Sequence, residues 1–231
     1  MKHEDVKERY FGFWYQVSKT VLRFYKLFCI NSIQLEGKEN LLPGQPKIIV
    51  ANHSNATDAF VLPFIFPDKL HFLILEENFS IPVFGRLLAL ADQIPVVLGR
   101  GREALSTAKK RLFEGNSVVI FPEGYLTHGK GFRRAGSGAA VLACETGKPI
   151  VPIGFFIPSK FTHTFRGHMF DRDTVGRWQI RGDCFVHVGG PIFAPPDSGF
   201  ESTYRFLRHL TDNVMAEISN LVKQAMEKAA Q

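Results

Sequence analysis

A histidine and an aspartate stand five residues apart just after a short apolar run in the first quarter of the chain. The run, Ile48–Ala51, is rich in β-branched side chains and predicts a buried strand. On one continuous helix, five residues turn through roughly 500°, which leaves the two side chains about 140° apart. His53 and Asp58 therefore meet only if His53 lies in the loop after the strand and Asp58 in the first turn of the next helix, where the helix dipole favours a carboxylate.

Such a pair has a definite chemistry. A carboxylate beside an imidazole selects one tautomer of the ring and stabilises its cation, so the ring acts as a general base. The pair brings no nucleophile of its own, and the nucleophile would then be a hydroxyl group of the substrate. The spacing alone is common by chance, and His168 and Asp173 repeat it, so at this point the catalytic interpretation stays open.

Apolar runs and amphipathic segments, which alternate along the chain, predict the strands and helices that must position these residues. We expect strands at residues 48–51, 70–75, 94–98, 117–121, 150–156 and 184–188. We expect helices at residues 10–30, 59–66, 79–91, 102–114, 137–146 and 201–229. Strands that alternate with helices predict an α/β fold with a mixed, largely parallel sheet flanked by helices. The length of 231 residues suits a single catalytic domain, placed at residues 35–231 after an N-terminal segment of residues 1–34.

In such a sheet, sites form in the loops at the carboxyl ends of the strands, and three loops qualify. The first carries His53. The second carries Arg100 and Arg102 between glycines and before a helix, an arrangement that suits a phosphate group but is also typical of a solvated turn. The third carries Glu123, which could hold substrate hydroxyls, orient backbone or be an ordinary turn acid. Arg133 and its neighbour in the following loop extend the predicted phosphate pocket.

The bulk composition points to an anionic partner. The net charge is +6 with a pI near 9.3, which fits a membrane surface, a phosphorylated substrate or nucleic acid. Among the aromatic residues, 22 Phe against five Tyr and two Trp favour apolar pockets and membrane contact over nucleic-acid binding, for which no ribonucleoprotein motif is present.

The predicted helix at residues 10–30 has two interpretations. Its charges Lys19, Arg23 and Lys26 share one face, and large aromatic side chains cover most of the rest, as in a helix that lies in a membrane interface. The alternative is a terminal helix packed on the domain with its basic stripe in solvent. No signal peptide and no uncharged apolar run of 18 residues is present, so we expect peripheral, monotopic association with a membrane rather than a spanning helix.

Three other patterns are weaker. Cys29, Cys144 and Cys184 are far apart and form no C-x-x-C pair, which indicates a reducing compartment and therefore the cytoplasmic face. Ser137 lies in an imperfect nucleophile elbow, but a hydrolase of that kind carries its acid and His after the Ser. A further group of His and Asp side chains has no ordered ligand spacing, so no metal and no cofactor is expected. This group consists of His163, His168, Asp171 and Asp173.

Three blocks of sequence together resemble a known family. They are Asn-His-x4-Asp at 52–58, Phe-Pro-Glu-Gly at 121–124 and Ile-Val-Pro-Ile at 150–153, followed by Gly-Gly-Pro-Ile at 189–192. In this order and spacing the chain resembles the glycerolipid acyltransferases typified by 1-acyl-sn-glycerol-3-phosphate acyltransferase (PlsC type). The resemblance runs from about Leu35 to the C-terminal helix.

The resemblance implies transfer of a fatty acyl group from acyl-CoA or an acyl-carrier-protein thioester to the free hydroxyl of 1-acyl-glycerol-3-phosphate, which gives phosphatidic acid without an acyl-enzyme. His53 would be the general base and Asp58 its orienting partner, and Glu123 and Gly124 would help shape the acceptor site. An arginine of the second block would bind the acceptor phosphate, a role for which Arg100 and Arg102 compete, and Arg133 matches another basic position of the family.

One departure bears on the acceptor. The family often continues Phe-Pro-Glu-Gly with Thr-Arg-Ser, whereas this chain has Tyr125, Leu126 and Thr127. Another lysophospholipid or a glycolipid therefore remains an alternative acceptor, and a non-catalytic lipid-binding homologue is the alternative outside enzymes. The apolar segments 59–66 and 79–90 are candidates for an acyl groove or for plain core packing. The donor, the acyl chain length and the oligomeric state are left open.

Overall fold

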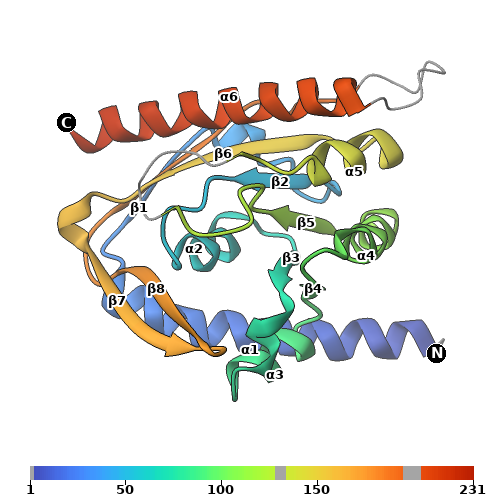
Figure 1. Cartoon of the computed structure of the whole chain (residues 1–231), viewed down its shortest axis with the longest axis horizontal. Coiled ribbons are helices and arrows are strands. Elements are labelled where there is room, and N and C mark those ends of the chain that lie inside the picture. Colours follow the sequence, from blue (N-terminus) through green and yellow to red (C-terminus); the bar gives the residue numbers. More distant parts are fainter. Residues whose placement is uncertain (1–2, 128–133, 195–203) are drawn as a thin grey trace.

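The computed structural model describes residues 3–127, 134–194 and 204–231 of the chain. Seven strands form one sheet in the order β1-β9-β6-β2-β5-β3-β4, and only the β6–β9 pair is antiparallel (Figure 1). The strands are β1 (Ile33–Glu36), β2 (Ile48–Ala51), β3 (Leu70–Leu75), β4 (Ile94–Val96), β5 (Ser117–Ile120), β6 (Ile150–Phe156) and β9 (Cys184–Val188). The prediction of an α/β fold with a mixed, largely parallel sheet is confirmed.

Helices cover both faces of this sheet, α6 along one side of the molecule and α1 along the opposite side (Figure 1). The helices are α1 (His3–Cys29), α2 (Asp58–Ile65), α3 (Phe84–Leu90), α4 (Gly101–Phe113), α5 (Gly138–Thr146) and α6 (Tyr204–Ala229). Short 3-10 turns lie at Lys38–Leu41, Glu76–Ser80 and Ser159–Phe161. The core consists of two clusters of buried apolar side chains. One lies between the sheet and α2, and the other lies between the sheet and α4, α5 and α6.

The strand β2 is the centre of the structure. It pairs with β5 on one side and with β6 on the other, and all four of its side chains are buried. A parallel strand covered on both faces needs apolar side chains at every position, which explains the unbroken apolar run. The helix α6 lies so close to β6 that a Cβ on Gly154 would come within 2.5 Å of the Leu221 carbonyl carbon.

Several elements differ from the sequence-based expectation. No strand was expected between residues 156 and 184, yet an antiparallel hairpin of β7 (Thr162–Met169) and β8 (Arg172–Gln179) forms there. The edge strand β1 was not expected, and the helix expected at 79–91 is divided into a 3-10 turn and the shorter α3, with Val83 between them at φ +65°. The hairpin lies largely in solvent, so its sequence lacks the apolar alternation by which strands are recognised.

Two tyrosines, the buried Tyr15 and the half-buried Tyr25, attach α1 to the domain. The hydroxyl of Tyr15 accepts the backbone N–H of Leu70 at 3.3 Å, and burial raises the Tyr15 pKa to about 12. The hydroxyl of Tyr25 donates to the carbonyl of Gln179 at the end of β8. The helix ends at Cys29 and β1 begins at Ile33, so the expected boundary between residues 34 and 35 lies within that strand.

The outward face of α1 is largely apolar, and of the three expected basic residues only Arg23 is exposed. Lys19 and Lys26 are only half exposed, and the Lys26 ammonium lies over the ring of Phe64 at 5.2 Å. Among residues 11–29, where the side chains of the helix are described, the most exposed apolar ones, at 61–73%, are Phe13, Phe24, Leu27 and Phe28. Within the residues that the structure describes, no helix combines the length and the hydropathy needed to cross a bilayer.

Candidate active site

His53 and Asp58 lie together at the carboxyl end of β2. The strand ends at Ala51, His53 lies in the loop that follows, and Asp58 is the first residue of α2. The Nδ1 atom of His53 and the Oδ2 atom of Asp58 are 3.4 Å apart. The predicted placement of the two residues is confirmed, while the catalytic role remains a prediction.

The carboxylate of Asp58 is completely buried, and the loop supplies its hydrogen bonds. The backbone N–H of Asn55 donates to Oδ2 at 2.8 Å, and the Asn55 side-chain amide lies 3.3 Å from Oδ1. A buried charge is tolerated only where it is paired and hydrogen-bonded. Asn55 thus holds the carboxylate in place, and His53 is its partner on the open side. Asn55 occupies an unspecified position of the His-x4-Asp spacing, so the sequence pattern does not mark it.

The imidazole of His53 rests against an aromatic ring with one edge open. It stacks on Phe121, the residue after β5, with ring centroids 4.0 Å apart and planes inclined by 18°. Its side chain is 19% exposed. Since Nδ1 faces Asp58, the remaining nitrogen, Nε2, is the one that can meet a substrate.

The loop after β5 also holds the backbone of His53. The N–H of His53 donates to Oε1 of Glu123 at 3.1 Å, and the carbonyl of His53 accepts the N–H of Thr127 at 2.9 Å. Glu123 is buried, and its hydrogen bond to the His53 backbone favours the backbone-orienting role among those left open. Gly124 follows in an exposed turn at φ +71°, a conformation that glycine adopts without strain.

Asn52 joins the ends of two strands. Its side-chain amide donates to the carbonyl of Phe155 at 3.0 Å and its Oδ1 accepts the N–H of Phe155 at 2.7 Å. The amide therefore reproduces a backbone pair where β2 stops and β6 continues. The asparagine of the Asn-His-x4-Asp block thus sets the direction in which the histidine loop leaves the sheet.

The arginines of the second loop lie at the same edge of the sheet but away from the His/Asp pair. The strand β4 is parallel to β3, which is parallel to β5 and through it to β2. Its carboxyl end is three strand positions from β2, roughly 14 Å at the usual strand spacing. Arg100 and Arg102 are exposed, and Nε of Arg100 donates to Glu103 at 2.9 Å. Arg133 lies outside the described residues.

The other candidate residues lie apart from the pair. Ser137 occupies the N-cap position of α5 without a side-chain capping bond. His163 packs edge-on against Phe165 on β7, and His168 faces Asp173 across the hairpin. In the described part of the chain, no group of three or more His, Cys, Asp or Glu side chains is arranged to hold a metal ion.

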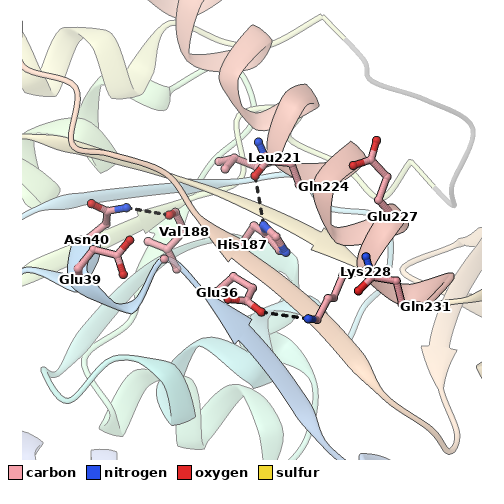
Figure 2. Close-up of a pocket in the computed structure, with 11 residues that line it drawn as sticks. Glu36, Glu39, Asn40, His187, Val188, Leu221, Gln224, Glu227, Lys228 and Gln231 are labelled. Atoms are coloured by element: carbon pink, nitrogen blue, oxygen red, sulfur yellow. Dashed lines mark hydrogen bonds and ion pairs between the residues drawn. The ribbon is translucent and has the colours of Figure 1, made fainter.

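A polar hollow of about 500 Å³ lies elsewhere, between β1, β9 and α6 (Figure 2). His187 is 3.2 Å from Gln224 there, and Lys228 lies 3.6 Å from Glu36. Glu36 ends β1 and His187 lies near the end of β9, both of which run antiparallel to β6. The hollow is therefore at the end of the sheet opposite His53, and none of the predicted site residues lines it.

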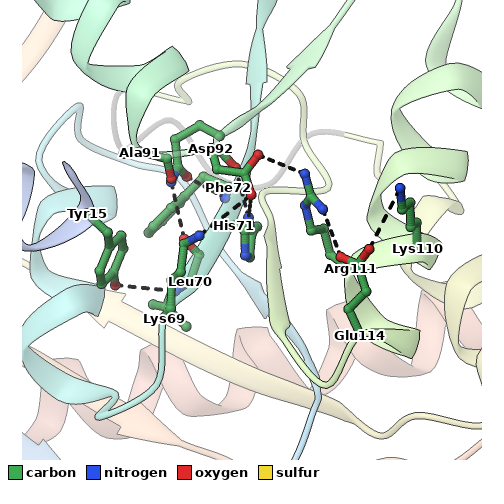
Figure 3. Close-up of polar contacts among 11 residues, drawn as sticks. Tyr15, Lys69, Leu70, His71, Phe72, Ala91, Asp92, Lys110, Arg111 and Glu114 are labelled. Atoms are coloured by element: carbon green, nitrogen blue, oxygen red, sulfur yellow. Dashed lines mark hydrogen bonds and ion pairs between the residues drawn. The ribbon is translucent and has the colours of Figure 1, made fainter. Parts of the chain in front are cut away.

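A buried histidine, His71, also lies at that opposite end (Figure 3). His71, near the start of β3, has Nδ1 at 2.8 Å from the carbonyl of Asp92 and 3.5 Å from its carboxylate. Arg111 and Lys69 also approach this carboxylate, at 2.8 and 3.6 Å. Burial lowers the pKa of His71.

Comparison with known proteins places this geometry in context. A family model described as Acyltransferase matches residues 32–155. A 1-acyl-sn-glycerol-3-phosphate acyltransferase of Pseudomonas aeruginosa is 30% identical over 124 residues, which are 52% of this chain and 48% of that protein. A lyso-ornithine lipid O-acyltransferase of the same organism is 32% identical over 113 residues, 48% of this chain and 43% of that protein. The matched part of the chain thus spans less than half of either protein.

A shorter relative and a solved structure are matched over more of their length. The 1-acyl-sn-glycerol-3-phosphate acyltransferase of Bacillus subtilis is 30% identical over 152 residues, 60% of this chain and 75% of that protein. The crystal structure of PlsC from Thermotoga maritima superposes with a TM-score of 0.64 at 21% identity, covering 100% of this chain and 84% of that one. The structural match supports the same fold.

Proposed function

This chain belongs to the Acyltransferase family, and we propose that it moves a fatty acyl group from an acyl-CoA or acyl-carrier-protein thioester to the free hydroxyl of 1-acyl-glycerol-3-phosphate at a membrane surface. The observation that carries the proposal is the pairing of His53 with the buried Asp58 at the end of β2. Phosphatidic acid and the free thiol are the products.

In the proposed mechanism, Nε2 of His53 removes the proton of the acceptor hydroxyl as its oxygen attacks the thioester carbonyl carbon. Asp58 holds the Nδ1–H tautomer and stabilises the imidazolium that forms. The new C–O bond gives a tetrahedral oxyanion, which collapses as the C–S bond breaks. The leaving thiolate takes the proton from His53, so the base is restored and no acyl-enzyme is formed.

The residues around the pair favour this role. Glu123 and Thr127 hold the His53 backbone from both sides, and Phe121 restricts rotation of the ring. A base that is already oriented spares the entropy of arranging it during the reaction. Glu123 is therefore proposed as a positioning residue, and Gly124 as part of the wall of the acceptor site.

For the acceptor phosphate we propose Arg100 and Arg102, with Arg133 as a further contact. They leave the same edge of the sheet as His53, and the roughly 14 Å between the strands, at the usual strand spacing, is within the combined reach of an arginine side chain and a glycerol phosphate. The guanidinium of Arg100 is paired with Glu103. An acceptor phosphate would replace that carboxylate with a doubly charged partner.

We further propose that α1 lies on the membrane surface. Its four most exposed apolar side chains extend from residue 13 to residue 28, about 22 Å along the helix axis. Exposed large apolar side chains on one face of a helix favour an interaction site. Arg23 flanks it, and the net charge of +6 favours an anionic bilayer. Peripheral association at the cytoplasmic face is the corresponding proposal for location.

A second acceptor class is supported by two observations. One relative is a lyso-ornithine lipid O-acyltransferase, and this chain has Tyr125 and Leu126 where an arginine-containing block is common among the glycerolipid acyltransferases that it resembles. The same His53 chemistry on a lysolipid without a phosphate is therefore the alternative function.

An acceptor panel separates these functions. Purified protein is supplied with a labelled acyl-thioester and, in turn, lysophosphatidate, other lysophospholipids, a lysoglycolipid and lyso-ornithine lipid. We expect the highest kcat/KM with lysophosphatidate, and a fall in that value when Arg100 or Arg102 is changed to Ala. A higher value with an acceptor that lacks phosphate assigns the alternative, and no turnover with any acceptor rejects the acyltransferase proposal in favour of lipid binding alone.

A further inference from the structure

The β7–β8 hairpin has no evident role in the proposed chemistry. Its strands of eight residues each pair along their whole length, from Thr162↔Gln179 to Met169↔Arg172, and they form a sheet of their own. A two-stranded hairpin is only marginally stable in water by itself. Every residue of β7 after Thr162 is exposed, so the hairpin is an arm that projects from the domain.

Large apolar side chains lie on this exposed arm among basic ones. Phe165 and Met169 share one face of β7, since they are four residues apart on a strand, and are 51% and 44% exposed. Val175 is exposed on the opposite face, beside Arg166. Residues 162–181 contain four Arg and two His against two Asp. Apolar side chains flanked by cations are the pattern of a surface that meets an anionic bilayer.

The end of the arm nearest the domain, at Arg177 and Trp178, is hydrogen-bonded to the loop that carries His53. The N–H of Ala56, in the loop between His53 and Asp58, donates to the carbonyl of Arg177 on β8 at 2.8 Å. The next residue, Trp178, packs on Phe60 of α2 with ring centroids 5.9 Å apart. Displacement of β8 would therefore move both the loop and the helix that carry the His/Asp pair.

The arm is also continuous with the outward face of α1. The ring of Phe60 packs edge-on against Tyr25, whose hydroxyl donates to Gln179 at the end of β8. Tyr25 adjoins the exposed Phe24, and Leu27 and Phe28 follow within one turn. The aromatic contacts Tyr25–Phe60–Trp178 thus connect the proposed membrane face of α1 to the hairpin.

The absence of a side chain at Gly176 leaves room for the indole of Trp178. A Cβ at position 176 would lie 2.6 Å from Nε1 of Trp178, because residues 176 and 178 share a face of the strand. Only glycine lets the indole lie close over the backbone here. Gly176→Ala is therefore a small substitution that disturbs the packing of Trp178 and retains both Phe165, its register partner on β7, and Met169.

We propose that the β7–β8 hairpin is a second membrane-contact arm, which inserts Phe165 and Met169 into an anionic phospholipid bilayer and, through Arg177 and Trp178, positions the catalytic loop while the protein is bound. The inference rests on the proposed function, in which the acceptor is a lipid taken from that bilayer. Two contacts, α1 and the arm, would orient the carboxyl end of β2 relative to the bilayer, which one helix alone cannot do.

Vesicle binding tests the arm directly. The double variant Phe165→Asp/Met169→Asp of the full chain is sedimented with phosphatidylcholine vesicles that contain phosphatidylglycerol. Phe113→Asp/Met226→Asp is the matched control, because those side chains are 61% and 48% exposed on α4 and α6, across the sheet from α1. We expect the hairpin variant to lose at least tenfold in partition coefficient and the control to match wild type. Wild-type partition of a correctly folded hairpin variant would overturn the proposal.

Activity separates this proposal from the proposed function. With a short-chain acceptor that stays monomeric in water, the hairpin variant should keep the wild-type rate, whereas its rate on vesicles that contain a long-chain acceptor should fall. If wild type turns over neither acceptor, the proposed function fails, while the sedimentation result still decides the membrane contact.

The link to the catalytic loop has its own test. Gly176→Ala should bind vesicles as wild type does but show a kcat about tenfold lower with KM unchanged. In a Trp14→Phe background, Trp178 is the remaining tryptophan of the two in the chain, and its emission should shift in the Gly176→Ala variant. A wild-type kcat together with a shifted emission would show that Trp178 does not position the catalytic loop.

Discussion

Two His-x4-Asp pairs in this chain have almost the same internal geometry and quite different surroundings. The ring nitrogen lies 3.4 Å from the carboxylate in His53–Asp58 and 3.2 Å in His168–Asp173. The side chains of the first pair are 19% and 0% exposed, and those of the second are 67% and 99% exposed. Spacing and distance therefore do not distinguish the two pairs, whereas burial does.

The difference in burial decides what each pair can do. His168 and Asp173 are directly opposite in the hairpin register, and water screens their attraction from all sides. Asp58 is enclosed, with the N–H of Asn55 as a fixed donor, so its charge acts on His53 through a medium of low polarity. A proton transferred to His53 thus meets a carboxylate that water does not screen.

The first prediction concerns the histidine of each pair. His53→Ala should reduce kcat/KM for acyl transfer by about 10³–10⁴-fold, because it removes the general base together with the group that orients the hydroxyl. His168→Ala, which deletes the same ring from the exposed pair, should leave the rate within twofold. The rates are measured with purified protein and a labelled acyl-thioester.

The unfolding temperature serves as the control for both alanine variants. The His53 side chain contacts Phe121 and Asp58 and is 19% exposed, and Asn55 still donates to Asp58 when the ring is removed. Its removal should therefore leave the folded state intact. An active His53→Ala protein, or an inactive His168→Ala protein of normal stability, would contradict the assignment of the pairs.

The second prediction concerns the carboxylates. Asp58→Asn should lower kcat by about 10²–10³-fold with little change in KM, because the amide no longer selects the correct tautomer or stabilises the imidazolium. Asp173→Asn should have no effect, since that carboxylate is fully solvated. Equal losses in the two variants, measured by steady-state kinetics, would refute the argument from burial.

The same contrast explains what the sequence could predict. Apolar runs such as Ile48–Ala51 identified the buried strands, and their ends located His53, Glu123 and Arg100 at one edge of the sheet. These elements are recognisable because burial on both faces requires an unbroken apolar run. The hairpin has no such requirement, and its pairing rests on backbone hydrogen bonds that leave little trace in composition.

Within the site, the sequence identified the reacting groups but not what holds them. Asn52 and Asn55 act through amide contacts to Phe155 and Asp58, and such contacts depend on tertiary position rather than on a local pattern. Phe121 belongs to the Phe-Pro-Glu-Gly sequence, yet its stacking on His53 depends on the pairing of β2 with β5. The apolar face of α1 was expected to be shared with a basic stripe, because the helical pattern does not say which side packs on the sheet.

The third prediction concerns Asn55, which hydrogen-bonds to the buried Asp58. Asn55→Ala keeps the backbone N–H that donates to Asp58 but removes the amide 3.3 Å from the other carboxylate oxygen. We expect kcat to fall about tenfold, since one hydrogen bond to a charged group contributes about 1.5–3 kcal/mol and only part of it acts in the transition state. A loss as large as that of Asp58→Asn would show that Asn55 has a direct part in the reaction.

The last prediction concerns the buried His71 and its partner Asp92, where burial disfavours the protonated ring instead of supporting it. Asp92 already binds Arg111 and Lys69, so a charge on His71 would be poorly compensated, and desolvation by burial lowers the His71 pKa. Its Nε2 atom is buried without a hydrogen-bond partner among the residues that the structure describes. An enclosed histidine therefore need not be a base that readily accepts a proton.

The lowered pKa makes stability depend on pH in a definite direction. As the pH falls below about 6.5, the unfolded chain takes up a proton at this position before the folded protein does, so folding stability is lost on acidification. Each kcal/mol of that loss lowers Tm by about 2–4 °C for a protein of this size. His71→Gln should show a smaller drop in Tm between pH 7.5 and 5.5 than wild type, and His168→Gln should follow wild type. Parallel Tm curves for His71→Gln and wild type would mean that His71 is not the group whose protonation weakens the fold.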